Sequence, residues 1–308
     1  SGEDSVKERY ERISRMFEEN VIKAQYNLSE GVKLELEWID ENTVDIRKFA
    51  EELYYRDDVM ALIGPLRNEN VDIVADAIYK KGMPMFVMTS SESIVRKYSS
   101  GTAGVKVKEP FLWSMSATDM LQSNIILAKA GCVGAEKISL ICPENTYGDT
   151  FYKWVPQFTG EMSLTLVDNV RYSDTRELQN ELERICKSET EAVICALNDT
   201  EEAKIVLEIA NDNPEAPKIF FTGSVFNSSL FRSGALAEGA EGFSMYPSPY
   251  TGFLQAYKTR FDELPILMEA QLYDSLLLSL ISFAYHHYSE GSISMNRVLA
   301  RLSDLPLT

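Results

Sequence analysis

The feature that most constrains the fold of this sequence is a repeated alternation of short apolar runs with longer segments of helical periodicity. One such run, residues 59–63, ends at Gly64-Pro65 and is followed by apolar residues at helical spacing over 70–81. A short apolar run bounded by turn residues is typical of a strand buried on both faces. Strands that alternate with helices pair in parallel through right-handed crossovers. The pattern predicts an open, doubly wound α/β protein.

The same alternation extends along the chain. Strands are predicted at 32–39, 59–63, 84–88, 111–115, 137–142, 164–170, 192–197, 218–222 and 242–246, and helices at 6–24, 43–55, 70–81, 119–129, 149–158, 175–187, 201–210 and 271–288. Residues 89–104 are predicted to be a polar connection. So many strands in 308 residues favour two parallel sheets over one, because a single core rarely grows far beyond roughly 250 residues. We expect one lobe from 1–116 with 248–308, a second from 117–247, and a hinge and cleft between them.

Composition and charge exclude several classes of function. Hydrophobic residues make up 45% and charged residues 25% of the chain, which is typical of a globular protein. The net charge of -17 repels phosphate backbones and anionic lipid, so neither a nucleic-acid partner nor a membrane-surface role is expected. No apolar run approaches the roughly 18 residues of a spanning helix. The chain opens with Ser1-Gly2-Glu3-Asp4, so we expect that any leader segment was removed or never present.

The sequence carries no recognisable catalytic or metal-binding motif. No GxSxG, P-loop, GxGxxG or HExxH pattern occurs, and the two histidines, His286 and His287, are adjacent and point to different faces of a helix. Cys142 and Cys195 lie in strand-like runs, where a free thiol behaves as a small buried hydrophobe. A bridge between the other two cysteines, Cys132 and Cys186, is geometrically conceivable. We expect no enzyme, no metal and no cofactor.

Polar residues with hydroxyl and amide groups follow the predicted strands. In open α/β sheets, ligands bind beyond the carboxyl ends of the strands, where loops and helix N-termini converge. The same residue types are also the preferred N-caps of helices, and Thr89-Ser90-Ser91-Glu92 has the spacing of a capping box, so each position taken alone is better explained by capping. Several such ends around one cleft would suit an anionic group.

The residues at the strand ends resemble a known family, the type I periplasmic binding proteins, and above all the branched-chain amino-acid binding proteins of ABC transporters and the related ligand-binding domains of receptors. The matching motifs are Ala-Leu-Ile-Gly-Pro at 61–65, Lys-Gly-Met-Pro-Met-Phe-Val-Met-Thr-Ser-Ser at 81–91, Pro-Phe-Leu-Trp-Ser-Met-Ser at 110–116, Asn-Thr-Tyr-Gly at 145–148, Ala-Glu-Gly-Ala-Glu-Gly at 237–242, and 253–261. They follow the family's order over most of 32–285.

This resemblance implies a periplasmic or extracellular protein, free or lipid-anchored, that captures a small polar ligand in the interlobe cleft for an ABC transporter permease. The ligand would be anionic or amino-acid-like. By position, the resemblance assigns ligand contacts in the first lobe to Arg67, Asn68, Thr89, Ser90 and Ser91, and contacts in the second lobe to Tyr147, Asn198, Gly223 and Ser224.

The chain departs from the family pattern at three places. The acidic residue that amino-acid-binding members carry near Gly223 and Ser224 is missing, and Arg67 stands where small hydroxyl residues are common, which favours an anionic ligand. We expect that the family's first strand and last strands lie outside this sequence, either because the ends were trimmed or because this is an atypical member. Three alternatives stay open: a receptor or regulatory domain on the same fold, which works with a membrane signalling partner; an α/β enzyme; and a scaffold of this fold that has lost its ligand.

Overall fold

The computed structural model describes residues 6–19, 35–99, 109–226, 230, 234–245 and 252–303. The chain divides into two compact units, Ser1–Ser116 with Leu267–Thr308, and Ala117–Ile266. We expected 248–266 in the first lobe, whereas the structure groups this segment, with helix α10 (Gly252–Phe261), with the second unit. Sequence periodicity predicts a helix, but it does not tell which unit the helix joins.

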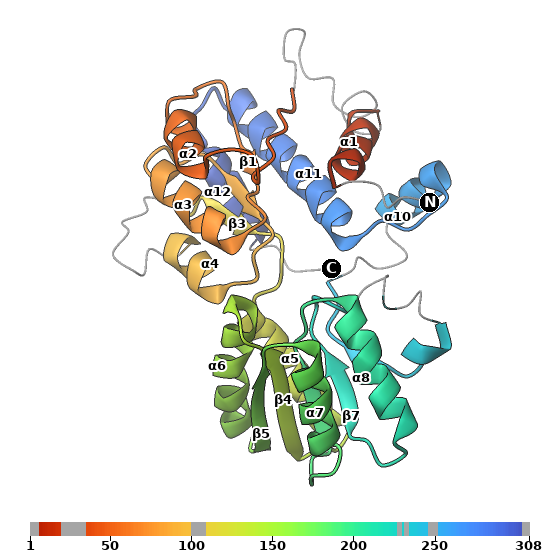
Figure 1. The fold of residues 1–308 in the computed structure, drawn as a ribbon. Coiled ribbons are helices and arrows are strands. Elements are labelled where there is room, and N and C mark those ends of the chain that lie inside the picture. The colour runs from red at the N-terminus through yellow and green to blue at the C-terminus, as the bar shows by residue number, and fades with distance from the viewer. Residues whose placement is uncertain are drawn as a thin grey trace. The chain divides into compact units, whose positions relative to one another are not determined.

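The second unit is built on a five-stranded parallel sheet (Figure 1). Its strands are β4 (Lys137–Pro143), β5 (Thr165–Tyr172), β6 (Ala192–Cys195), β7 (Lys218–Phe221) and β8 (Glu241–Gly242), in the order β5-β4-β6-β7-β8. Every neighbouring pair is parallel. The predicted doubly wound α/β class is confirmed.

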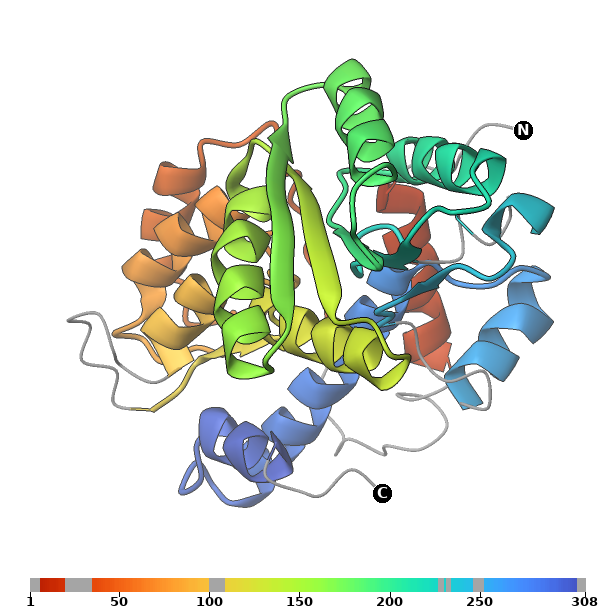
Figure 2. The same cartoon turned by 90° about the horizontal axis from the view of Figure 1, so that it is seen from below.

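Helices cover both faces of this sheet, as Figures 1 and 2 show. The helices are α5 (Asp119–Cys132), α6 (Thr146–Glu161), α7 (Thr175–Ile185) and α8 (Thr200–Asp212). In β4, Leu140 packs in the core with α5 and α6, while its neighbour Ile141 packs in the core with α7 and α8. Because successive side chains of a strand point to opposite faces, the mostly apolar run of β4 supplies both cores.

The first unit has a three-stranded parallel sheet of short strands in the order β1-β2-β3. The strands are β1 (Leu62–Ile63), β2 (Met85–Val87) and β3 (Leu112–Ser114), and the helices are α1 (Val6–Phe17), α2 (Ile46–Tyr54), α3 (Asn68–Ile78), α4 (Glu92–Ser99), α11 (Leu267–Tyr288) and α12 (Met295–Ser303). In Figure 1, α2, α3 and α4 lie on one side of the strands and α11 lies on the other.

Helix α4 replaces part of the polar connection predicted over 89–104. Ile94, Val95 and Tyr98 recur at helical spacing, and Tyr98 is fully buried against the core that holds α3. The Tyr98 hydroxyl lies 2.6 Å from Oδ1 of Asp76 and 2.9 Å from Oδ1 of Asp72, both on α3. The segment was predicted to be a polar connection because serines and charged residues surround its few apolar residues. Contacts with α3 stabilise the short amphipathic helix.

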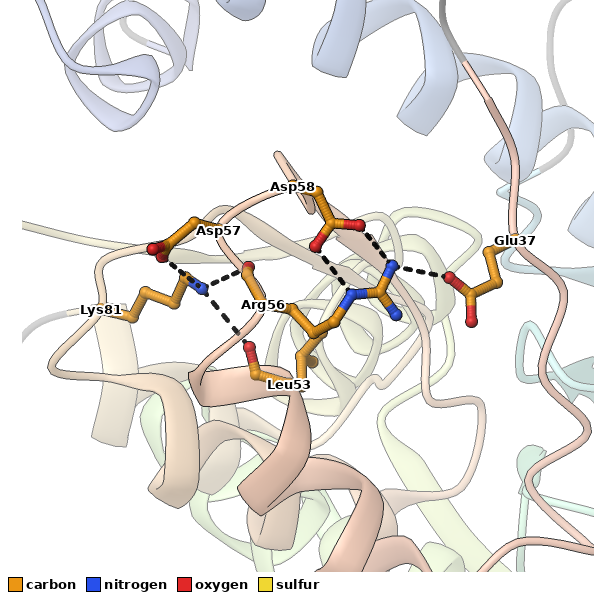
Figure 3. Close-up of polar contacts among 6 residues, drawn as sticks. All are labelled: Glu37, Leu53, Arg56, Asp57, Asp58 and Lys81. Carbon is orange, nitrogen blue, oxygen red and sulfur yellow. Dashed lines mark hydrogen bonds and ion pairs between the residues drawn. The ribbon is translucent and has the colours of Figure 1, made fainter.

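The strand predicted over 32–39 is wrong for its described part, because residues 35–39 form no strand. Trp38 stacks on Tyr10 of α1 with ring centroids 5.5 Å apart, and Glu37 forms an ion pair with Arg56 at 3.0 Å (Figure 3). The alternating side chains therefore give this extended segment one side that faces helix α1 and one side that carries charge. The segment does not pair with any strand of the described ranges. Residues 32–34 lie outside the described part of the chain.

Helix α2 ends beside a cluster of charged residues that lies just before β1 (Figure 3). The ammonium of Lys81 donates to the carbonyl oxygens of Leu53 at 3.4 Å and Arg56 at 2.5 Å, where a helix C-terminus attracts positive charge. The Arg56 guanidinium donates two hydrogen bonds of 2.7 Å to Asp58, and this pairing lowers the pKa of Asp58 to about 2. The cluster stabilises the entry into β1.

All four cysteines are free thiols, so the bridge between Cys132 and Cys186 does not form. Cys142 and Cys195 are buried in their strands, as the sequence predicted. Burial raises the pKa of Cys142 to about 12, which keeps this thiol protonated.

Candidate functional site

The carboxyl ends of β4 and β7 bring together two of the predicted site residues, Tyr147 and Ser224. The Tyr147 hydroxyl lies 3.0 Å from Oγ of Ser224 and 2.8 Å from Oγ1 of Thr222. Tyr147 is half-buried at the start of α6, and Ser224 is exposed in the turn after β7. Ser224 in turn donates to the carbonyl oxygen of Leu197, at the end of β6, at 2.8 Å. Three parallel strands thus contribute to one cluster of hydroxyl groups.

Asn198, the predicted contact after β6, lies on the same edge of the sheet. Its Oδ1 accepts a hydrogen bond of 2.8 Å from Nδ2 of Asn145, and Asn145 is the N-cap of α6. Both asparagines are exposed. The edge therefore presents amide groups beside the hydroxyl cluster, as the prediction from strand ends required.

Gly223 contributes its backbone rather than a side chain. Its N–H donates at 3.0 Å to Oε1 of Gln122, a buried residue of α5 whose Nε2 donates to the carbonyl oxygen of Ala117. A Cβ atom at Gly223 would lie 3.1 Å from that Gln122 oxygen, so the close approach favours glycine. Gln122 was not predicted, since a polar residue on a helix is ordinarily taken to be exposed.

Asp119 is the second residue that the sequence reasoning missed. It lies in the first turn of α5 and is only 1% exposed, and its Oδ1 accepts from the backbone N–H of Met120 at 2.8 Å. Burial raises the pKa of Tyr147, and the negative charge of Asp119 adds to the rise. An acid in a first helical turn usually complements the helix dipole, so its position gave no sign of a site.

In the first unit, three predicted residues gather at the carboxyl end of β2. Oγ1 of Thr89 donates to Oδ1 of Asn68 at 2.5 Å and accepts from the backbone N–H of Ser91 at 3.1 Å. Thr89 and Ser91 are buried, whereas Asn68 is half-buried at the start of α3. These side chains connect the turn after β1 with the turn after β2. Such a structural role agrees with the sequence analysis, which explained each of these positions by helix capping.

The two remaining predicted residues of the first unit are Arg67 and Ser90, and Arg67 is the more open to solvent. Arg67 is exposed at the N-cap position of α3, and it makes no side-chain capping bond. Its guanidinium forms no ion pair with any residue of the described ranges. Ser90 is half-buried in the turn between Thr89 and Ser91. A positive group that projects from a helix N-terminus can attract an anion.

The described part of the chain offers no obvious metal site. No group of three or more histidine, cysteine, aspartate or glutamate side chains there has the geometry to hold a metal ion. No helix within the described ranges has both the length and the apolar character needed to cross a membrane.

Comparison with known proteins identifies the family. Residues 22–285 match the family described as periplasmic binding protein. No protein of curated function matches the sequence significantly. One similar solved structure is a solute-binding protein of an ABC transporter from Rhodopseudomonas palustris BisB5 in complex with 3,4-dihydroxybenzoic acid. It is 17% identical with a TM-score of 0.71, and the alignment covers 96% of this chain and 80% of that protein. The leucine-binding protein LivK from Thermotoga maritima MSB8 is 15% identical with a TM-score of 0.69, over 95% and 81%.

A third similar structure is the substrate-binding protein LivJ from Streptococcus pneumoniae in complex with isoleucine. It is 17% identical with a TM-score of 0.66 and covers 88% of this chain and 77% of its own. At such identities the structures show the shared fold. The family match spans most of the sequence, so this chain belongs to the periplasmic binding protein family. The predicted resemblance is thereby confirmed, and membership implies an extracytoplasmic location.

Proposed function

We propose that this chain is the solute-binding protein of an ABC transporter and that it captures a small polar ligand without changing it chemically. The observation that carries the proposal is the hydroxyl cluster of Tyr147, Thr222 and Ser224 at the carboxyl edge of the second unit's sheet. Ligands of open α/β proteins bind at that edge. Tyr147 would contact the ligand from this unit, and Arg67 would neutralise an anionic group from the first.

The hydroxyl protons of the cluster indicate which ligand group fits there. Each hydroxyl has a single proton. Ser224 uses its proton on the carbonyl oxygen of Leu197 at 2.8 Å, and Thr222 lies 3.5 Å from the carbonyl oxygen of Cys195. The Tyr147 proton is directed to Thr222 or Ser224, so its oxygen retains lone pairs that can accept. A ligand group that donates a hydrogen bond therefore suits the Tyr147 oxygen.

A ligand that satisfies both Arg67 and Tyr147 has a carboxylate and a hydrogen-bond donor. Amino acids provide an ammonium group as the donor, and hydroxylated aromatic acids provide a phenolic hydroxyl. The related proteins described above are in complex with compounds of these two kinds, 3,4-dihydroxybenzoic acid and isoleucine. We infer that the ligand of this chain belongs to one of these two classes.

Matched pairs of probes test this inference. Titration calorimetry would compare 4-hydroxybenzoate with benzoate, and L-leucine with 4-methylpentanoate, since each second compound lacks the donor. A probe that binds should also add about 2.7 kcal/mol to the free energy of unfolding at 100 times its dissociation constant. Removing the donor should weaken binding by roughly tenfold or more. Equal affinity for both members of a pair would contradict the donor requirement.

Variants assign the contacts to residues. Tyr147→Ala and Arg67→Ala should each weaken binding by about 1–3 kcal/mol and leave the fold intact. Tyr152→Phe is the matched control, because Tyr152 lies on the same helix with 41% of its surface exposed and belongs to no part of the cluster. Unchanged affinity in both alanine variants would remove these two assignments.

A further inference from the structure

A buried carboxylate lies next to the exposed amides of the proposed site. Glu202 is in the first turn of α8 and is 9% exposed. Its Oε2 accepts from the backbone N–H of Asn198 at 2.7 Å and from the Tyr172 hydroxyl at 2.5 Å, and its Oε1 accepts from Nδ2 of Asn198 at 3.1 Å. Donors from the end of β5 and from the turn after β6 thus converge on one side chain.

The hydrogen bonds continue from Glu202 to the start of α6. Oδ1 of Asn198 accepts from Nδ2 of Asn145 at 2.8 Å, and Oδ1 of Asn145 accepts from the backbone N–H of Gly148 at 3.0 Å. Gly148 directly follows Tyr147. The chain therefore connects the turn after β6 with the helix start that positions the aromatic residue of the site.

The two ends of this chain determine the orientation of both amides. The backbone N–H of Gly148 can only donate, and the Glu202 carboxylate can only accept. Each asparagine between them offers an acceptor on one side and a donor on the other. Turning either amide over would bring two donors or two acceptors face to face, and hydrogen bonds that are half-buried at Gly148 and Glu202 and exposed between the two asparagines would be lost.

We propose that Glu202 is a positioning residue: it holds the amides of Asn198 and Asn145 in a single orientation and so sets the affinity of the binding edge without touching the ligand. The effect on affinity rests on the proposed function, because the amides matter for binding only if the ligand binds at this edge. The effect on orientation does not depend on any ligand.

Glu202→Gln tests the proposal with little change in shape. In either orientation of the new amide, its NH2 group faces an N–H donor of Asn198, so one hydrogen bond is replaced by a contact between two donors. Glu201→Gln is the matched control, because the Glu201 side chain is 77% exposed and pairs with Lys204 at 2.6 Å. The same charge is removed one residue away, outside the hydrogen-bonded chain.

Two measurements on the full chain test the proposal: NMR spectra of the amide groups and calorimetric titrations of the ligand probes. In ¹⁵N NMR spectra without ligand, Glu202→Gln should shift the side-chain amide signals of Asn145 and the backbone signal of Gly148, and Glu201→Gln should leave them in place. In calorimetric titrations with 4-hydroxybenzoate and L-leucine, Glu202→Gln should bind about tenfold more weakly than wild type. If Glu202 only stabilised the fold, its replacement by glutamine would lower the unfolding temperature but leave the signals of Asn145 and Gly148 in place.

The outcomes separate the two proposals. Unchanged Asn145 and Gly148 signals in Glu202→Gln would overturn the positioning role. Shifted signals with undiminished affinity for a probe that the wild type binds would overturn its effect on the binding edge. If the wild type binds neither probe, the proposed ligand classes fail, and the NMR comparison still decides whether Glu202 orients the amides.

Discussion

Gly148 offers a sharp test of how closely helix α6 approaches strand β4. A Cβ atom at this position would lie 1.9 Å from the carbonyl oxygen of Pro143 and 2.9 Å from its carbonyl carbon. Both atoms belong to the backbone at the end of β4, so no side chain can rotate away. Gly148→Ala therefore requires the start of α6 to move, although its backbone conformation does not itself require glycine.

The same helix contains the control. A Cβ atom at Gly160 would meet no atom within 4 Å, and Gly160 is exposed. Overpacking typically costs about 1–3 kcal/mol, whereas replacing an unconstrained helical glycine with alanine stabilises a protein by roughly 0.5–1 kcal/mol. We expect the free energies of unfolding of the two variants to differ by about 1.5–4 kcal/mol, with Gly148→Ala below the wild type and Gly160→Ala above it.

Scanning calorimetry and urea unfolding would measure the difference. For a unit of about 150 residues, each kcal/mol shifts the midpoint by roughly 4 °C, so the two variants should melt about 6–16 °C apart. Calorimetry also shows whether the two units unfold in separate transitions, in which case only that of the second unit should move. A Gly148→Ala protein that melts at or above the wild-type temperature would refute the close approach.

Three further predictions concern cysteine thiols and a buried carboxylate. At pH 8, iodoacetamide should label the exposed Cys132 in the native protein and spare Cys142, as peptide mass mapping would show; equal labelling rates would contradict its burial. Burial raises the pKa of Cys142 to about 12 from an ordinary 9.0, so the thiol loses its proton at lower pH in the unfolded chain than in the folded one. The free energy of unfolding should therefore fall as pH rises from 9 towards 12. Cys142→Ala should make this fall less steep. In the first unit, Glu269→Gln should lower the free energy of unfolding by about 3 kcal/mol, because the fully buried Glu269 lies 3.5 Å from Arg9, whereas Glu11→Gln on the exposed face of α1 should cost less than about 1 kcal/mol in the same urea titration.

Most elements of the second unit could be predicted closely because their signals are local, whereas the strand predicted over 242–246 is observed as the shorter β8 (Glu241–Gly242). The apolar run predicted at 137–142 is β4 (Lys137–Pro143), and the helical pattern predicted at 201–210 is α8 (Thr200–Asp212). A strand that is covered on both faces needs an apolar residue at every position, whatever its partners are. Periodicity therefore suffices for such elements.

The segment 35–39 shows where local pattern fails. Its alternation is that of a half-buried strand, but a strand also needs a neighbour to pair with. Here Trp38 finds its apolar contact on Tyr10 instead. The choice between a helix face and a sheet edge depends on residues far away in the sequence, so it cannot be made from the segment itself.

The sequence by itself determined the α/β order of the elements and the presence of polar strand ends, because both follow from residues that are neighbours along the chain. Only the tertiary structure decided which of those ends share hydrogen bonds, as Tyr147 does with Ser224, and that Glu202 turns back to hold Asn198. In the sequence, Glu202 resembles any acid in a first helical turn. The positioning role that we propose for it depends on Tyr172, which bonds Glu202, and on Asn145, which bonds Asn198; the parallel sheet brings these residues together although they lie far apart in the sequence.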